Sequence, residues 1–231
     1  PFYVMTNESD YAFMDEGLVT FLSREAERRL PADHAAINLG VSMASYDKIA
    51  GTTTETPMMV KSFMVSDYAT YMRYAYNRPN TAFYHLRELL GHEDFNRGLK
   101  AFMDRWKQKK PTPYDFFYTF EDVLDRDLAW FWKPWFFEFG YPDLAVTKLE
   151  IHKKQHRVII ENTGGLPLPV KLTVEFENGS RKTIEKSAEV WKSENQIAIT
   201  LNSDKQIQRV KLGDHDIPDV YRNNNLFSKK Q

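Results

Sequence analysis

The sequence predicts a multi-domain protein of α and β structure, in which a helical part is followed by an antiparallel β-sandwich. Before Gly140-Tyr141-Pro142 apolar residues recur at helical spacing, and beyond it they alternate with polar residues. We therefore expect a domain boundary at this turn, with residues 1–141 helical and residues 142–231 forming the sandwich. A chain of 231 residues is long enough to bury the cores of two modest domains.

The helical part is expected to open with an amphipathic helix. It starts at Ser9-Asp10, where a capping side chain precedes the apolar stripe, and Pro31 ends it. A weaker helical stretch follows over residues 34–50. Arg78-Pro79 is expected to break the Met- and Tyr-rich segment that precedes it. The later helices are predicted from Asn80 to Gly91, from Glu93 to Lys107, from Phe116 to Val123 with Asp115 as cap, and from Asp127 to Phe139.

The last of these helices has aromatic residues on every side, which favours burial between layers or between domains. After it, short alternating segments separated by turn pairs such as Asn178-Gly179 predict strands. A tail from Pro218 to Gln231 is expected to be loose. The predicted strands are Leu144 to His152, Arg157 to Asn162, Val170 to Phe176, Arg181 to Lys186, Gln196 to Leu201 and Ile207 to Leu212.

Composition limits the classes of partner and site. A formal net charge of -1 gives no reason to expect nucleic acid or an anionic membrane as partner, and no apolar run approaches the roughly 20 residues of a membrane helix. We expect a soluble protein, cytoplasmic or of the cell envelope, with an oligomeric state that the sequence does not indicate. The chain begins at Pro1 rather than Met, so we expect a mature or truncated product.

The sequence contains no Cys, so a metal would have to be held by His, Asp or Glu. No pair among the six His has the spacing of H-E-x-x-H on a credible helix. His152 and His156 have the interval, but they lie between two predicted strands and are interpreted as exposed hairpin residues.

The triplet Asp15-Glu16-Gly17 stands at the head of the first helix. Acidic residues there commonly complement the helix dipole. A carboxylate followed by Gly and an apolar stripe is also what a buried metal ligand needs. The packed helix holds the carboxylate rigidly, and the Gly allows the backbone to be approached closely. The residues alone leave both readings open.

Several blocks of the sequence, taken in order, resemble the thermolysin-like gluzincin aminopeptidases downstream of their zinc helix. The blocks are MDEGLVTFL, YNRPNTAFYHLRELLG, FNRGLKAFMDRW, PTPYDFFYTFEDV and LAWFWKPWFFEFGYPDL. The resemblance covers roughly residues 1 to 145 and implies the helical C-terminal half of a thermolysin-like catalytic domain. The strands beyond it are similar in type to the sandwich that follows this domain in the family.

The resemblance implies roles for two residues. Glu16 stands where the family has its third zinc ligand, and Tyr76 stands where the family has the Tyr that stabilises the oxyanion. Around Tyr76, the residues Asn77, Arg78 and Pro79 replace the commoner Glu, Lys and Gly. Tyr74 is the competing candidate.

The family's H-E-x-x-H ligands and general base would precede Pro1, as would its exopeptidase signature. The intact protein is therefore expected to be a zinc aminopeptidase acting on peptides, and this chain alone to be inactive and metal-free. The alternative is a non-catalytic interaction module that uses the aromatic segment from Trp130 to Phe139 and the sandwich. Carbohydrate binding through an exposed Trp191 is a further possibility.

Overall fold

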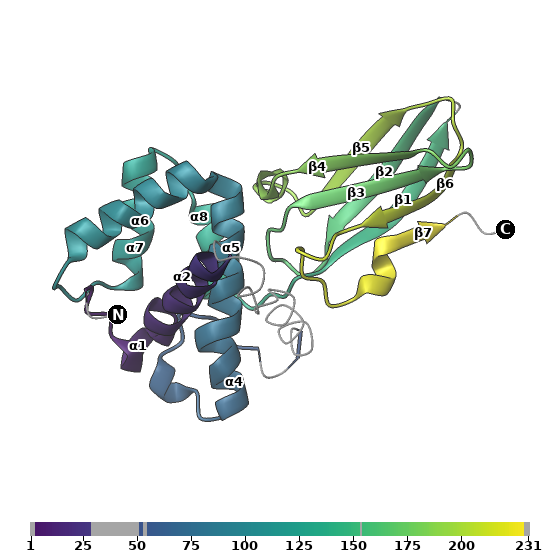
Figure 1. Ribbon diagram of the computed structural model, residues 1–231. Helices are drawn as coiled ribbons and strands as arrows, with labels where there is room; N and C mark the ends of the chain where they lie inside the picture. The colour runs from purple at the N-terminus through teal and green to yellow at the C-terminus, as the bar shows by residue number, and fades with distance from the viewer. Residues whose placement is uncertain (1–2, 29–50, 53–54, 153, 229–231) are drawn as a thin grey trace. The chain divides into compact units, whose positions relative to one another are not determined.

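The computed structural model describes residues 3–28, 51–52, 55–152 and 154–228 (Figure 1). The chain divides into two compact units, Pro1–Phe139 and Gly140–Gln231. The first unit is helical and the second contains two antiparallel sheets, so the predicted fold class, helices followed by a β-sandwich, is confirmed. The helix predicted over residues 34–50 lies outside the described residues, as does Pro31. Among the described helices, none combines the length and apolar character that a membrane span requires.

The helical unit contains α-helices interrupted by π-helical turns. Its elements are α1 (Glu8–Ala12), the π turn η1 (Phe13–Gly17), α2 (Leu18–Glu27), the 3-10 turn η2 (Ser62–Met64), α4 (Tyr68–Met72), the π turn η3 (Arg73–Asn77), α5 (Arg78–Leu90), α6 (His92–Trp106), α7 (Pro113–Leu124), α8 (Ala129–Trp132) and the π turn η4 (Lys133–Phe137).

Aromatic rings fill the core of the helical unit. Phe116 lies 4.6 Å from Phe120 between ring centroids, and Phe117 stacks on Trp132 at 4.9 Å. The aromatic segment around α8 and η4 belongs to this core, because its inward rings are buried inside the unit. Phe139, at its end, is 75% exposed. The other buried aromatic side chains include Phe13, Phe21, Phe83, Phe102, Phe131, Trp135 and Phe136.

Two helix boundaries differ from the predictions because of proline. Arg78-Pro79 does not break the helical path: η3 runs directly into α5, and Pro79 occupies the first turn of α5. Proline is tolerated there because an N–H in the first turn has no partner within its own helix. Likewise α7 begins at Pro113 rather than Phe116. Thr112 and Asp115 form a capping box, in which the Asp115 carboxylate accepts from the Thr112 backbone N–H at 2.7 Å.

The second unit is a sandwich of two antiparallel sheets (Figure 1). One sheet has the order β1-β2-β5 and the other β4-β3-β6-β7. Residues along β3 alternate between buried and half-buried, as the VKLTVEF pattern predicts. The strands are β1 (Leu144–His152), β2 (Gln155–Asn162), β3 (Val170–Phe176), β4 (Arg181–Lys186), β5 (Gln196–Asn202), β6 (Ile207–Leu212) and β7 (Leu226–Ser228), with short 3-10 turns η5 (Ala188–Trp191) and η6 (Arg222–Asn225).

Two expectations for this unit, those for His156 and for the tail, are wrong, and the structure does not support the sugar-binding alternative for Trp191. His156 is not an exposed hairpin residue: it is fully buried on β2, and its Nε2 lies 3.1 Å from the Lys205 carbonyl. Trp191 is 9% exposed and donates to the Leu168 carbonyl at 2.7 Å, so it offers no open ring face for a sugar. The tail is not loose up to Ser228, because β7 pairs with β6.

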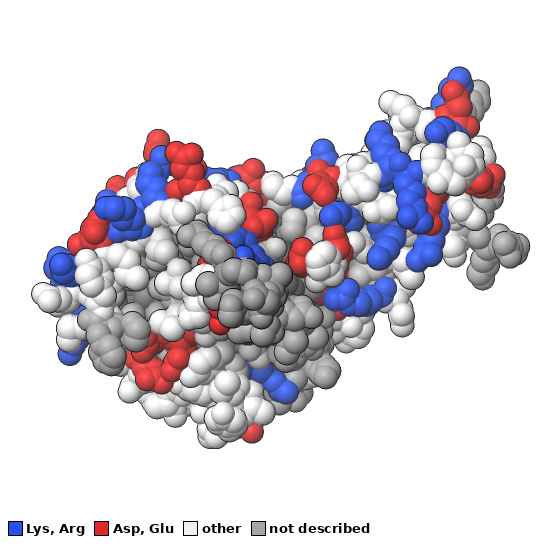
Figure 2. All heavy atoms as spheres, in the orientation of Figure 1, with Lys and Arg blue, Asp and Glu red and all other residues white. Residues whose placement is uncertain are grey.

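Charges of both signs are mixed on the face of the molecule that Figure 2 shows. In the second unit, Lys171 of β3 pairs with Asp214, which follows β6, at 2.5 Å, and Arg181 of β4 pairs with Glu175 of β3 at 3.0 Å. This mixture agrees with the nearly balanced composition of the chain.

Candidate active site

The two π turns of the helical unit that carry the predicted site residues lie against each other. Glu16 is in η1, at the junction with α2, and Tyr76 is in η3, at the junction with α5. The turns η1 and η3 are in contact, although they are far apart in the sequence. π turns of this kind occur often at functional sites. The fold therefore brings the two residues to one place.

Glu16 and Tyr76 interact directly. The Tyr76 phenol is hydrogen-bonded to the Glu16 carboxylate, and both residues are half-buried. Desolvation by burial raises the pKa of the Tyr76 phenol, and the Glu16 carboxylate raises it further. The phenol is accordingly protonated at neutral pH and can donate a hydrogen bond. The backbone at Glu16 is held as well, since its carbonyl accepts from the Thr20 hydroxyl at 2.6 Å.

A second phenol belongs to the same surroundings. Tyr71 in α4 donates to the Glu8 carboxylate at 3.1 Å. Burial, then the bond to Glu8, and to a smaller extent the charge of Glu16, raise the pKa of Tyr71 to about 12. Glu8 is exposed, so this pair lies at the solvent side. Sequence reasoning missed both residues, because neither stands in a recognisable motif.

Tyr74, the competing candidate, is a core residue. It is 2% exposed, and its hydroxyl donates to the Val60 carbonyl at 2.6 Å and lies 3.2 Å from the Ser62 hydroxyl. Ser62 in turn accepts from the backbone N–H of Ala12 at 2.8 Å. Ser62 therefore ties α1 to the segment before α4, and Tyr74 ties η3 to the same segment, so its phenol is already engaged in the core.

Arg78, two residues after Tyr76, anchors this end of α5. Its guanidinium is buried and pairs with the Glu55 carboxylate at 2.6 Å. It also donates to three main-chain carbonyls around η4, those of Pro134 and Trp135, each at 3.1 Å, and of Glu138 at 2.9 Å. Helix ends leave such carbonyls without partners inside the helix. Arg78 satisfies them and so fixes the start of α5 against η4.

Glu16 is a candidate for one position of a zinc site, and the described residues do not supply the others. Its carboxylate is half-buried on a backbone held by packing, which suits a ligand for a divalent metal. Within the described part of the chain no three His, Asp or Glu side chains are grouped so that they could hold a metal ion. Catalytic zinc commonly takes three protein ligands. Further ligands would have to come from outside these residues.

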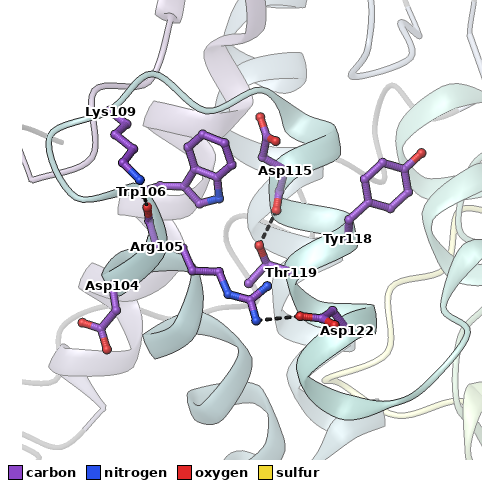
Figure 3. A pocket seen from close by; sticks show the side chains of 8 residues that line it. All are labelled: Asp104, Arg105, Trp106, Lys109, Asp115, Tyr118, Thr119 and Asp122. Carbon is purple, nitrogen blue, oxygen red and sulfur yellow. Dashed lines mark hydrogen bonds and ion pairs between the residues drawn. The ribbon is translucent and has the colours of Figure 1, made fainter.

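A different hollow lies between α6 and α7 (Figure 3). Two pairs of its polar groups interact: Arg105 pairs with Asp122 at 2.6 Å, and the Thr119 hydroxyl donates to the Asp115 carbonyl at 2.6 Å. The hollow contains neither Glu16 nor Tyr76. We assign no function to it.

Comparison with known proteins identifies the family. Residues 3–135, more than half of the chain, match the sequence model of the peptidase family M1 domain. The chain therefore belongs to peptidase family M1, and the resemblance to gluzincin aminopeptidases is confirmed. Peptidases of this family are in general zinc-dependent. No curated protein matches the sequence directly.

A solved structure extends the likeness to the second unit. The chain is similar to the crystal structure of Legionella pneumophila aminopeptidase A in complex with aspartic acid, with a TM-score of 0.64 and 18% sequence identity. The match covers 90% of this chain and 24% of that chain, so our chain spans about a quarter of the length of that aminopeptidase. At this identity the likeness concerns the fold.

Proposed function

We propose that this chain is part of a longer zinc aminopeptidase, which removes N-terminal residues from peptides by means of metal-activated water. In this proposal Glu16 is one of the zinc ligands and Tyr76 donates a hydrogen bond to the oxyanion. The observation that carries it is the contact between the Glu16 carboxylate and the Tyr76 phenol in a chain of family M1. The Legionella protein of similar fold is named an aminopeptidase, which agrees with this activity.

The chemistry explains why these two residue types are needed. When bound, zinc supplies a Lewis acid that lowers the pKa of a water molecule and polarises the scissile carbonyl. The chain's own contribution is a carboxylate held on η1 and a protonated phenol held on η3. Attack on a peptide carbonyl creates a tetrahedral oxyanion, and a phenol O–H directed at that oxygen stabilises it. The half-buried position of Tyr76 strengthens this bond, because less water competes for the donor.

We also propose that the chain by itself is inactive and does not retain zinc. Glu16 is one carboxylate, and the described residues offer no group of three ligands around it. Zinc-dependent peptide hydrolysis by a purified sample of this chain would contradict the proposal. The coding sequence upstream of Pro1 gives an independent test, because the proposal requires an H-E-x-x-H in frame, its last His about four positions before Pro1.

Substitutions in the longer protein test the two roles separately. Tyr76→Phe is expected to lower kcat by about a hundredfold or more, because one oxyanion donor is lost. Glu16→Gln is expected to lower the zinc content, measured by metal analysis of the purified protein. Tyr74→Phe is the matched control: its phenol is engaged in the core, so we expect a loss of stability of about 1 kcal/mol with turnover preserved. Unchanged turnover in Tyr76→Phe would remove that residue from the mechanism.

A non-catalytic interaction module is the second candidate. Its sequence basis was the aromatic segment from Trp130 to Phe139, but Phe131, Trp135 and Phe136 are fully buried in the helical core. Phe139 and part of Phe137 remain at the surface. The structure thus favours the peptidase reading. An upstream coding sequence without H-E-x-x-H would favour the module.

A further inference from the structure

Gly17 lies in unusually close contact with Pro79. A Cβ atom built on Gly17 would lie 2.5 Å from both Cβ and Cγ of Pro79 and 3.1 Å from the carbonyl oxygen of Ala75. An ordinary contact begins at 3.4 Å. The backbone of η1 can therefore approach η3 and α5 this closely only because residue 17 has no side chain.

Pro79 contributes to the same contact from the other side. It has no backbone N–H, so it donates no hydrogen bond to the Ala75 carbonyl one turn earlier. The Ala75 carbonyl lies against Gly17, and the Pro79 ring covers the Gly17 Cα. Both partners are stiff, because the ring is locked and Gly17 is packed within a helix. The contact thus fixes the distance between two helical segments.

Each candidate site residue is a close neighbour of this contact. Glu16 directly precedes Gly17, and Tyr76 lies three residues before Pro79, which places it one turn away on the same side of the helical path. A change in the distance between Gly17 and Pro79 therefore also changes the distance between Glu16 and Tyr76.

We propose that Gly17 and Pro79 are positioning residues, which set the spacing between the Glu16 carboxylate and the Tyr76 phenol. The catalytic meaning of this spacing rests on the function proposed above, but the spacing itself does not. A methyl group at residue 17 requires a shift from 2.5 Å to 3.4 Å, about 1 Å. Hydrogen-bond distances span only about 0.5 Å, so this shift breaks or rearranges the bond between Tyr76 and Glu16.

The test uses the chain as it stands and reads the phenol directly. Tyrosine is labelled with ¹³C at the ring Cζ, and the Tyr76 resonance is assigned by its loss in Tyr76→Phe. Gly17→Ala is expected to move this resonance. Gly98→Ala is the matched control, because its new Cβ would lie 2.7 Å from the Phe120 ring in the same helical unit but away from the site. We expect it to lower stability by about 1–3 kcal/mol and to leave the Tyr76 resonance in place.

Removing the ring should relieve the effect. In the double variant Gly17→Ala with Pro79→Gly, the Tyr76 resonance is expected to move back most of the way to that of Pro79→Gly alone, because the new methyl no longer meets the ring and only its 3.1 Å contact with the Ala75 carbonyl remains. Three results would overturn the proposal: an unmoved resonance in Gly17→Ala, an equal movement in Gly98→Ala, or no relief in the double variant.

Kinetics in the longer protein separates this inference from the proposed function. If both hold, Gly17→Ala lowers kcat by about a hundredfold, the usual consequence of a 1 Å misplacement, and the double variant recovers most of it. If the longer protein hydrolyses no peptide, the proposed function fails. The resonance measurements still test whether Gly17 and Pro79 set the spacing between Glu16 and Tyr76. If Gly17→Ala moves the Tyr76 resonance but leaves kcat unchanged, the contact sets the spacing and the spacing has no role in catalysis. That result would refute the proposal that Gly17 and Pro79 are positioning residues.

Discussion

Lowering the pH from 7 to 5 is expected to destabilise the helical unit through His85. This residue of α5 is 2% exposed, and its ring stacks on Trp135 with the centroids 6.0 Å apart. Neither ring nitrogen has a hydrogen-bond partner within the described part of the chain. Burial, and secondarily the charge of Arg87, lower the pKa of His85 to about 3.

The sign follows from proton binding in the two states. The pKa of an unfolded His is about 6.5, so between about pH 6.5 and 3 the unfolded chain binds a proton that folded His85 does not. This contribution to stability is fully present above the unfolded pKa and is lost as the pH falls toward the folded pKa. At pH 5 the loss from this one residue amounts to about 2 kcal/mol relative to pH 7.

Urea unfolding of the wild type and of His85→Phe at the two pH values measures this contribution. Other groups also titrate in this range, but their effects cancel when the two proteins are compared. The wild type is expected to lose about 2 kcal/mol more than His85→Phe between pH 7 and pH 5. His92→Gln is the matched control, because His92 is exposed, and it should behave as the wild type. Equal losses in the wild type and His85→Phe would refute the assignment.

Two further predictions concern stability alone. Arg78→Ala should lower the free energy of unfolding by about 3–5 kcal/mol, because it removes one partner of a buried ion pair with Glu55. Arg105→Ala, which breaks an exposed pair, should cost no more than about 1 kcal/mol. Equal effects in a thermal melt would contradict the distinction. Asp115→Ala should lower stability by about 1 kcal/mol, because it opens the capping box of α7. Asp104→Ala, which removes only the exposed pair with Lys100, should lower it by about 0.3–0.5 kcal/mol. Equal losses in urea unfolding would contradict the role of the capping box.

Proline shows where reading the sequence locally reaches its limit. At Arg78-Pro79 the local rule predicts a break, and at Pro113 it places the residue before the helix that was expected to start at Phe116, yet both prolines lie in the first turn of a helix. A proline is compatible with either outcome. The choice depends on whether the preceding residues can continue the path or cap it, as η3 does before Pro79 and Thr112 before Pro113.

Buried polar residues show the same limit. The position of His152 and His156 between two predicted strands indicated a hairpin, but it did not indicate which side of the sheet His156 would face. That side is set by the register of β2 against β1 and β5, which buries His156. A lone Trp among strands is normally core or edge packing, and Trp191 is packed in this way, since its indole donates to the Leu168 carbonyl.

The sequence by itself determined the two-part architecture, most of the strand boundaries and the family, because alternation, helical periodicity and motif order are local properties. It also singled out Glu16 and Tyr76 as candidates. Only the tertiary structure decided that Tyr76 rather than Tyr74 lies against Glu16, and that Gly17 and Pro79 hold the two segments together. Such contacts join residues far apart in the chain. They are fixed by the packing of whole helices, which no single stretch of sequence encodes.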